Sequence, residues 1–262
     1  MTLRNIFLQS PAFSFQNNIF YQQHFQRFNT FEKVYLSLRE KENRVYPDEI
    51  VKGLPEVSSH HALRKEWMIR KFTLQRLIPY LSKKNQPKIL ELGCGNGWLS
   101  NHLATLPNSE VVGMDVNETE LIQGSRVFTE TKNLFFAYAD ILIASLPYSH
   151  FDYIILSGSI QYFRDIGILF AKLFALLADN GEIHIVDSPF YNEDDVSSAY
   201  KRSEEYFTSA GFPLMEQHYH HHTWQMLKPF HPKILYNPAI FFNKMKQKVS
   251  VASPFPWVLI TP

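Results

Sequence analysis

Short apolar runs alternate with longer segments of helical periodicity along the middle of the chain. The apolar runs have the length and composition of strands that are buried on both faces of a parallel sheet. They span residues 88–92, 111–115, 134–139, 151–157 and 183–187. The segments between them repeat apolar residues at the spacing of an amphipathic helix. These helices are expected to begin at residue 98 and to cover about 117–130, 166–177 and 192–211. Strands that alternate with helices in this way predict an α/β, doubly wound sheet whose central strands are parallel.

The two ends of the chain follow other patterns. Before the first strand, apolar residues from His61 to Ser82 keep helical spacing, and Ser59 is a suitable N-cap. After the last helix, residues 213–222 and 256–261 each predict a strand, with no convincing helix between them to form a parallel crossover. We therefore expect these two strands to pair antiparallel at the edge of the sheet.

The turn after the first strand has the composition of a ligand-binding loop. It runs Gly93-Cys94-Gly95-Asn96-Gly97 between the strand and the helix that follows. Glycines allow a ligand to lie against bare backbone beside a helix N-terminus. The dinucleotide-binding pattern G-x-G-x-x-G would need a third glycine where Trp98 stands, and its pyrophosphate would meet the acid Glu91. An acid two residues before the first glycine suits a cationic ligand better.

This loop, in the form E-x-G-x-G-x-G, resembles the first motif of the class I S-adenosylmethionine-dependent methyltransferases. The resemblance covers about residues 60–222 and the final strand, and it is strongest to the broad subfamily that includes quinone-biosynthesis methyltransferases (methyltransferase type 11). It implies a Rossmann-like, seven-stranded sheet that is mostly parallel, with an antiparallel last strand and helices on both faces.

The resemblance also implies which residues bind the cofactor, S-adenosylmethionine. The glycine loop would shape the wall against its methionine part, Glu91 would organise the amino-acid end, and Asp115, 22 residues after Gly93, would bind the ribose hydroxyls. Asp140 would reach the adenine, although Asp115 and Asp140 could instead cap the helix or turn that follows each of them. The implied set is Glu91, Gly93, Cys94, Gly95, Asn96, Gly97, Asp115, Val116, Asp140, Ile141, Ser157, Gly158 and Gln161.

Methyl transfer from a sulfonium requires alignment and exclusion of water more than any particular catalytic group. A general base is needed only when the acceptor is a hydroxyl or a protonated amine. Candidates at the carboxyl ends of the strands are Asp187, Tyr162 and Tyr191, with Asp187 preferred. The alternative for Asp187 is a turn-forming role before Ser188-Pro189.

The tail contains a histidine-rich segment, His218 to His222. In a strand, His218, His220 and His222 would share one face at a spacing compatible with metal ligands. No cysteine and no acidic cluster lies nearby in the sequence. We therefore expect no metal, and one histidine that reaches the substrate.

Composition indicates a globular protein with one main domain. Its 262 residues, 45% of them hydrophobic, can bury a full core. A single cysteine excludes a disulfide framework and fits a reducing compartment. Because neither a signal-peptide pattern nor an apolar run of membrane-spanning length is present, we expect a cytoplasmic protein without membrane segments.

Charge is distributed unevenly along the chain. Residues 1–85 carry +7, residues 86–216 carry −11 and residues 217–262 carry +5. The basic flanks either dock on the acidic centre and neutralise it or line a pocket for an anionic substrate. Basic residues that are spread rather than clustered argue against binding of nucleic acid.

The flanks also suggest the domain organisation. The N-terminal residues 1–58 are too aromatic for a disordered tail and must pack on the core or on a partner subunit, so a homodimer formed through them is one alternative. We expect this segment to act as a lid on a methyltransferase domain at 59–262. A second lid is expected at about 223–255, where Lys228, His231 and Lys233 could meet a carboxylate or phosphate.

Together these features predict S-adenosylmethionine-dependent methyl transfer to a small molecule with an aromatic or apolar body and some negative charge. After the fourth strand the chain has Leu156-Ser157-Gly158-Ser159 in place of the N/D-P-P-Y/F sequence of amino-methylating nucleic-acid enzymes. The alternatives are a non-catalytic S-adenosylmethionine-binding interaction protein, an RNA methyltransferase and a nicotinamide oxidoreductase. The last is disfavoured by Glu91 and Trp98.

Overall fold

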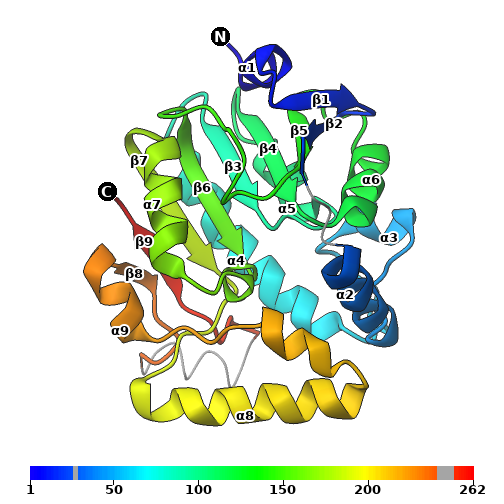
Figure 1. The fold of residues 1–262 in the computed structure, drawn as a ribbon, viewed down its shortest axis with the longest axis vertical. Coiled ribbons are helices and arrows are strands. Elements are labelled where there is room, and N and C mark those ends of the chain that lie inside the picture. The colour runs from blue at the N-terminus through cyan, green and yellow to red at the C-terminus, as the bar shows by residue number, and fades with distance from the viewer. Residues whose placement is uncertain (26–28, 241–250) are drawn as a thin grey trace.

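A mixed sheet forms the centre of the computed structural model, which describes residues 1–25, 29–240 and 251–262. Among these residues the sheet has nine strands in the order β1-β2-β5-β4-β3-β6-β7-β9-β8 (Figure 1). The strands are β1 (Phe13–Gln16), β2 (Ile19–Gln22), β3 (Lys88–Leu92), β4 (Glu110–Asp115), β5 (Leu134–Tyr138), β6 (Phe151–Ser157), β7 (Leu177–Val186), β8 (Lys233–Tyr236) and β9 (Trp257–Ile260).

Helices precede, separate and follow these strands. The α-helices are α1 (Leu3–Gln9), α2 (Asn29–Lys41), α3 (Asp48–Gly53), α4 (Arg64–Leu81), α5 (Trp98–Leu103), α6 (Glu118–Val127), α7 (Ile166–Leu176), α8 (Glu193–Ala210) and α9 (Trp224–Leu227). The 3-10 helices are η1 (Ile160–Tyr162), η2 (Pro213–His218) and η3 (Lys228–Phe230). The expected helix over residues 61–82 is confirmed as α4, although its N-cap is Leu63 and not Ser59.

The predicted doubly wound sheet is confirmed. Strands β5, β4, β3, β6 and β7 pair in parallel, and β9 runs antiparallel between β7 and β8. Six of these seven strands were expected, and β8 takes the edge position that we expected for residues 213–222. The count differs because the β1–β2 hairpin adds two strands at the opposite edge, where β2 pairs in parallel with β5.

Alternating side chains of the central strands face two separate cores, as a sheet covered on both faces requires. Leu90 and Leu92 of β3 belong to the core that includes α7 and α1, whereas Ile89 belongs to the core that includes α4, α5 and α6. Figure 1 shows α2, the start of α4 and the long α8 beyond the carboxyl ends of the central strands. That end of the sheet is where ligands bind in folds of this type.

The aromatic N-terminal segment packs on the core, which is one of the two alternatives that the sequence left open. Phe7 lies 5.1 Å from Phe13 and 5.2 Å from Phe20, and Phe20 lies 5.2 Å from Phe135 of β5, between ring centroids. Phe7 and Phe20 are almost completely buried. The first 25 residues are therefore part of the sheet and its core, and α2 and α3 follow them on the side of the cavity described below.

The strand expected at residues 213–222 is wrong. Pro213 begins η2, and Met215 is buried against Phe207 of α8, so this segment closes a small hydrophobic cluster instead of extending the sheet. The edge position belongs to β8, a four-residue strand within the segment expected to form the second lid. Residues 241–250 of that expected lid lie outside the described residues. No described helix combines the length and hydrophobicity needed to cross a bilayer.

Candidate active site

The glycine loop between β3 and α5 has a backbone that glycine adopts more readily than other residues. Gly93, Gly95 and Gly97 have φ angles of 74°, 54° and 76°, in the left-handed region where a side chain is disfavoured. A Cβ on Gly93 would lie 2.4 Å from Cβ of Ser159, and one on Gly97 would lie 2.5 Å from Cε1 of Phe136. The shape of the loop therefore depends on its glycines.

Asp115, the last residue of β4, holds this loop in place. Its Oδ2 accepts a hydrogen bond from the backbone N–H of Gly95 at 2.8 Å, and its Oδ1 accepts one from the backbone N–H of Asn117 at 2.9 Å. The N-cap of α6 is Asn117, whose side chain accepts from the N–H of Glu120 at 3.2 Å. Burial raises the pKa of Asp115. The helix is thus capped by Asn117, which leaves Asp115 at the cavity.

Two further carboxyl groups line the same cavity. Glu91 is only 2% exposed, and burial raises its pKa to about 8 although Ser100 donates a hydrogen bond to it. Burial likewise raises the pKa of Glu120 to about 7, against the opposing effect of Arg39. Both groups therefore hold a proton for much of the time at neutral pH. A cation in the cavity would favour their charged forms.

The turn after β6 lies against the glycine loop. The Ser159 hydroxyl donates a hydrogen bond to the carbonyl oxygen of Leu92 at 2.6 Å. The side-chain amide of Gln161 donates to the carbonyl oxygen of Gly158, also at 2.6 Å, and Gly158 has a φ of 62°. The first bond joins the turn after β6 to the end of β3, and the second closes the turn itself.

Asp187, which follows β7, has a φ of 53°, a conformation that Asp adopts more readily than most residues. Its Oδ1 accepts a hydrogen bond from the Thr73 hydroxyl at 2.6 Å, and its Oδ2 accepts one from the Ser157 hydroxyl at 3.2 Å. Burial raises the pKa of Asp187, with the Arg70 charge opposing that rise. A carboxylate with a raised pKa is better suited to take a proton near neutral pH.

The other two catalytic candidates, Tyr162 and Tyr191, are neutral phenols at physiological pH. Burial raises the pKa of both hydroxyls. They can exchange hydrogen bonds with a ligand but do not supply a phenolate. Of the three candidates, Asp187 alone has the chemistry of a base at neutral pH.

One cavity of about 940 Å³ brings together nearly all the residues expected at the site. It is lined by Glu91, Gly93, Cys94, Gly95, Asn96, Asp115, Val116, Asp140, Ile141, Ser157, Gly158, Gln161, Tyr162, Asp187 and Tyr191. Gly97 is not among the lining residues, because it caps α5 and approaches Phe136. Cys94 is buried, and burial raises the pKa of its thiol, so it is a packing residue and not a nucleophile.

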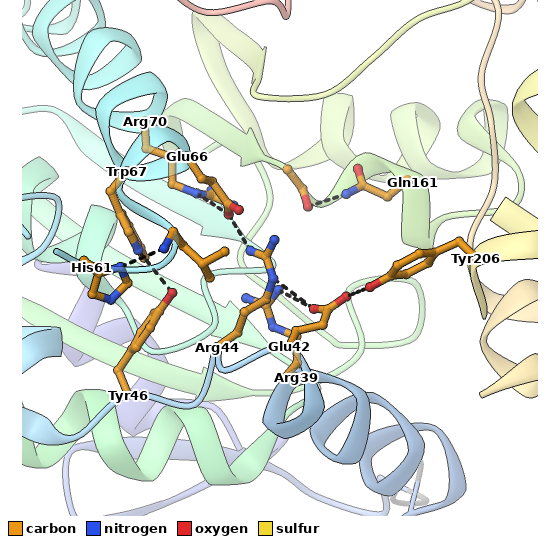
Figure 2. A network of polar contacts seen from close by, with 12 residues as sticks. Arg39, Glu42, Arg44, Tyr46, His61, Glu66, Trp67, Arg70, Gln161 and Tyr206 are labelled. Carbon is orange, nitrogen blue, oxygen red and sulfur yellow. Dashed lines mark hydrogen bonds and ion pairs between the residues drawn. The ribbon is translucent and has the colours of Figure 1, made fainter. Parts of the chain in front are cut away.

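The wall that faces these residues is formed by α2, α4 and α8, and sequence reasoning missed it. Glu66 Oε1 accepts from Arg44 Nη1 at 2.5 Å and from Arg70 Nη2 at 3.1 Å. Glu42 Oε2 lies 2.9 Å from Arg44 Nε and 3.7 Å from Arg39 Nη1, and Glu42 also accepts a hydrogen bond from Tyr206. We call Arg39, Glu42, Arg44, Glu66, Arg70 and Tyr206 the charged network (Figure 2). Its signals in the sequence are the i,i+4 spacing of Glu66 and Arg70 and the i,i+3 spacing of Arg39 and Glu42.

The histidine-rich segment is not a strand: His218 ends η2, and residues 219–222 lie outside the strands of the sheet. His221 Nε2 lies 2.9 Å from the Ser203 hydroxyl, and His222 Nε2 lies 3.1 Å from the carbonyl oxygen of Ile160. His221, which is not one of the three that we expected to align, lines the cavity. Within the described part of the chain, no group of three or more His, Cys, Asp or Glu side chains is placed to hold a metal ion.

The expected second lid contributes to the cavity in a different way from that predicted. Pro254 and Phe255 line the cavity, whereas Lys228, His231 and Lys233 are not among its lining residues. They belong to the segment η3–β8 at the edge of the sheet. The Arg and Lys side chains that reach the cavity come from α2, the loop after it, α4 and α8.

Comparisons with known proteins agree with this arrangement. A family model described as a methyltransferase domain matches residues 90–183. The chain is 30% identical over 135 residues to the malonyl-[acyl-carrier protein] O-methyltransferase of Bacillus cytotoxicus, an alignment that covers 50% of this chain and 46% of that protein. The chain contains a class I S-adenosylmethionine-dependent methyltransferase domain. This domain holds the glycine loop, Asp115 and the turn after β6.

Other similarities to the methyltransferase domain concern its fold or a small part of a larger protein. The geranyl diphosphate C-methyltransferase of Streptomyces coelicolor A3(2) superposes with a TM-score of 0.59 over 90% of this chain and 98% of that one, at 14% identity. "Probable polyketide synthase 22" of Dictyostelium discoideum is 28% identical over 149 residues, which is 50% of this chain and 6% of that protein. The chain therefore spans about half or less of the curated relatives that it matches. The quinone-biosynthesis-like subfamily stays a prediction.

S-adenosylmethionine is the cofactor of this methyltransferase domain, and the residues present fit it. The positive φ angles of Gly93, Gly95 and Gly158 leave backbone exposed where a side chain would be strained. Asp115 ends the second parallel strand, where doubly wound folds bind ribose hydroxyls. The buried carboxyl groups of Glu91 and Glu120 suit a ligand that carries an ammonium and a sulfonium group.

Proposed function

We propose that this protein transfers a methyl group from S-adenosylmethionine to a small-molecule acceptor. One observation supports the proposal above the others: the ends of β3, β4, β6 and β7 open into a single cavity of about 940 Å³. That volume is near the upper end for small-molecule sites, so it offers room for an acceptor beside the cofactor. The facing wall, with arginines and aromatic rings, suits an acceptor with an apolar or aromatic body and a negative charge.

Each part of the cavity has a distinct task in this reaction. When bound, the cofactor supplies an electrophilic methyl group bonded to a sulfonium sulfur, which is a good leaving group. Glu91 holds the amino-acid end and Asp115 holds the ribose, while the glycine loop provides the wall between them. The remaining task of the chain is to align the acceptor and exclude water.

Asp187 is the group that takes a proton when the acceptor is a hydroxyl or a protonated amine. Thr73 and Ser157 donate hydrogen bonds to its two oxygens, so the carboxylate keeps one orientation. Its raised pKa moves its titration closer to neutral pH. Tyr162 and Tyr191 line the same cavity and can hold the acceptor by hydrogen bonds.

The lid role that we assign to residues 1–58 falls on α2, which contributes Phe31, Tyr35 and Arg39 to the cavity wall. Deleting residues 1–50 is not a suitable test of that role. The deletion would remove two strands and the buried Phe7 and Phe20 from the core. Single substitutions on α2 test it without that loss.

Calorimetric titration of the purified protein with S-adenosylmethionine, S-adenosylhomocysteine and NADH tests the proposal directly. We expect micromolar binding of the two sulfur compounds and none of NADH. Gly95→Arg should abolish binding, since it adds a large cation at a residue with a φ of 54° and beside Glu120. A melting temperature of the variant near that of wild type controls for misfolding. Absence of binding to the wild-type protein would refute the proposed function.

A further inference from the structure

Four aromatic rings from α2, η1 and the segment after η2 lie together in the wall of the cavity. Phe31 and Tyr35 of α2 lie 6.0 Å and 5.9 Å from Tyr162 of η1, between ring centroids. Tyr219, after η2, lies 5.9 Å from Tyr162 on a nearly perpendicular plane. All four rings line the cavity. We call Phe31, Tyr35, Tyr162 and Tyr219 the aromatic compartment; it offers edge and face contacts to a flat apolar molecule.

The charged network beside this compartment is not electrically balanced. It contains three guanidinium groups, on Arg39, Arg44 and Arg70, but only two carboxylates, on Glu42 and Glu66 (Figure 2). Hydrogen bonds and charges from Arg44 and Arg70 hold the pKa of Glu66 at about 2, well below its usual value, despite the opposing effect of burial. The formal charges of the network are three positive and two negative. One positive charge is therefore left over.

The unbalanced charge lies on Arg39. Arg44 and Arg70 both donate to Glu66, and Glu42 lies close to Arg44, whereas Arg39 reaches Glu42 only at 3.7 Å, beyond hydrogen-bonding distance. Among the described residues, no group accepts a hydrogen bond from the buried Nε of Arg39. The guanidinium carbon lies 5.6 Å from the centroid of the Tyr35 ring. A three-quarters-buried cation thus lines the cavity beside the aromatic compartment, with Glu42 at 3.7 Å but no hydrogen-bonded anionic partner among the described residues.

We propose that Arg39 binds a carboxylate of the acceptor while the aromatic compartment holds the acceptor's ring. The proposal rests on the proposed methyl transfer, and it names the acceptor as an aromatic carboxylic acid. A guanidinium fork matches the two oxygens of a carboxylate. A ligand carboxylate would therefore supply the hydrogen-bonded negative charge that Glu42, at 3.7 Å, does not supply. Arg39 is then a specificity-determining residue.

A carboxylate fits this position better than a phosphate. Glu42 lies near Arg39, and Glu120, whose pKa is about 7, interacts electrostatically with it. A single negative charge balances the remaining positive charge of the network, whereas a dianionic phosphate would add repulsion from these two acids. A neutral acceptor would leave that charge unbalanced.

Binding of simple probes to the complex with S-adenosylhomocysteine tests this assignment. Benzoate, benzyl alcohol and phenyl phosphate would be titrated at millimolar concentrations and followed by ligand-observed NMR. We expect benzoate to bind more tightly than the other two. Arg39→Gln should weaken benzoate binding by about 10- to 100-fold, the effect of losing a charge-assisted pair. Arg39→Lys, which keeps the charge but not the fork, should give an intermediate loss.

The matched control is Lys33→Gln, which removes a positive charge from the exposed side of the same helix, and it should leave benzoate binding unchanged. Affinity for S-adenosylhomocysteine should stay within about threefold of wild type in Arg39→Gln, a difference under 1 kcal/mol. A large loss of that affinity would place Arg39 at the cofactor and overturn the proposal. So would tighter binding of phenyl phosphate, or benzoate binding that is absent or unaffected by Arg39→Gln. If the wild-type protein does not bind S-adenosylhomocysteine at all, the proposed function itself fails.

Discussion

The two walls of the cavity are built in different ways. The first, which we call the cofactor wall, consists of residues 91–96, 115–117, 120, 140–141, 157–159 and 161, which lie at or shortly after the ends of four strands of the sheet. The second is the charged network of α2, α4 and α8. Backbone conformation determines the cofactor wall, through the positive φ angles of its glycines. Side-chain contacts between distant segments determine the charged network.

This difference predicts how each wall responds to substitution. A change in the cofactor wall should mainly alter binding of the cofactor, because its residues are supported by adjacent strands. A change in the charged network should mainly alter stability or acceptor binding, because its residues connect three helices. The following predictions test that separation, starting with the largest effect.

Asp115→Ala should weaken binding of S-adenosylhomocysteine by at least about 100-fold, or ~2.7 kcal/mol. The substitution removes the acceptor of the Gly95 and Asn117 N–H groups as well as the group assigned to the ribose. Calorimetry measures the change, with Glu66→Gln as the control from the facing wall. A similar affinity loss in both variants would contradict the separation of the two walls.

Glu66→Gln should lower the free energy of unfolding by about 2 kcal/mol, because two partly buried guanidinium groups lose their shared charged acceptor. The side chains of Arg44 and Arg70 are only 21% and 22% exposed, so water cannot fully replace the charged hydrogen-bond acceptor that they lose. Urea denaturation measures the loss. Asp48→Asn, which disrupts an exposed pair with Arg126, is the control and should cost less than about 1 kcal/mol. Equal losses would show that the charged network contributes no more than a surface pair.

Stability without cofactor should fall as the pH rises from about 5 to about 7, in part because of Glu120. Its pKa is about 7 in the folded protein and near 4.5 in the unfolded chain, so the folded state binds more protons across this interval. Stability decreases with pH wherever the folded state holds the additional proton. Glu120→Gln should therefore make this slope shallower in urea denaturation at several pH values. An unchanged slope would contradict the raised pKa.

Tyr206→Phe should have the smallest effect, a loss of stability of about 1 kcal/mol or less. It removes the hydroxyl that α8 donates to Glu42 of the charged network, but Arg44 still neutralises that carboxylate. Urea denaturation measures the change, and S-adenosylhomocysteine affinity should be that of wild type. A loss as large as that of Glu66→Gln would indicate that α8 is a main support of the network.

The cofactor wall could be predicted from the sequence because its signals are local. Glycines at 93, 95 and 97 and acids at strand ends stand next to apolar runs that are easy to recognise. The structure brings these residues into one cavity, with Gly97 as the exception. The short β8 was missed because its four residues stand between Pro232 and Pro238 in a segment without clear alternation.

The charged network could not be predicted in the same way. Arg44 and Glu66 are 22 residues apart, and Glu42 and Tyr206 are 164 residues apart. Each of these residues alone resembles an ordinary solvated side chain. Only the packing of α2 and α8 over the sheet brings them together, and local periodicity carries no information on that packing. For the same reason, the sequence analysis offered both basic flanks as a pocket lining but named individual residues only on the tail, whereas Arg39, Arg44 and Arg70 of the first flank line the cavity.

The raised pKa values of Glu91 and Glu120 have a consequence for the thermodynamics of ligand binding. Both carboxyls are partly protonated near pH 7 in the structure, and a cationic ligand would lower their pKa values. Binding of S-adenosylmethionine would then release protons to the buffer. Its observed enthalpy would include the heat with which the buffer takes up those protons, and its affinity would increase with pH. Binding would thus replace protons on Glu91 and Glu120 with the positive charge of the cofactor.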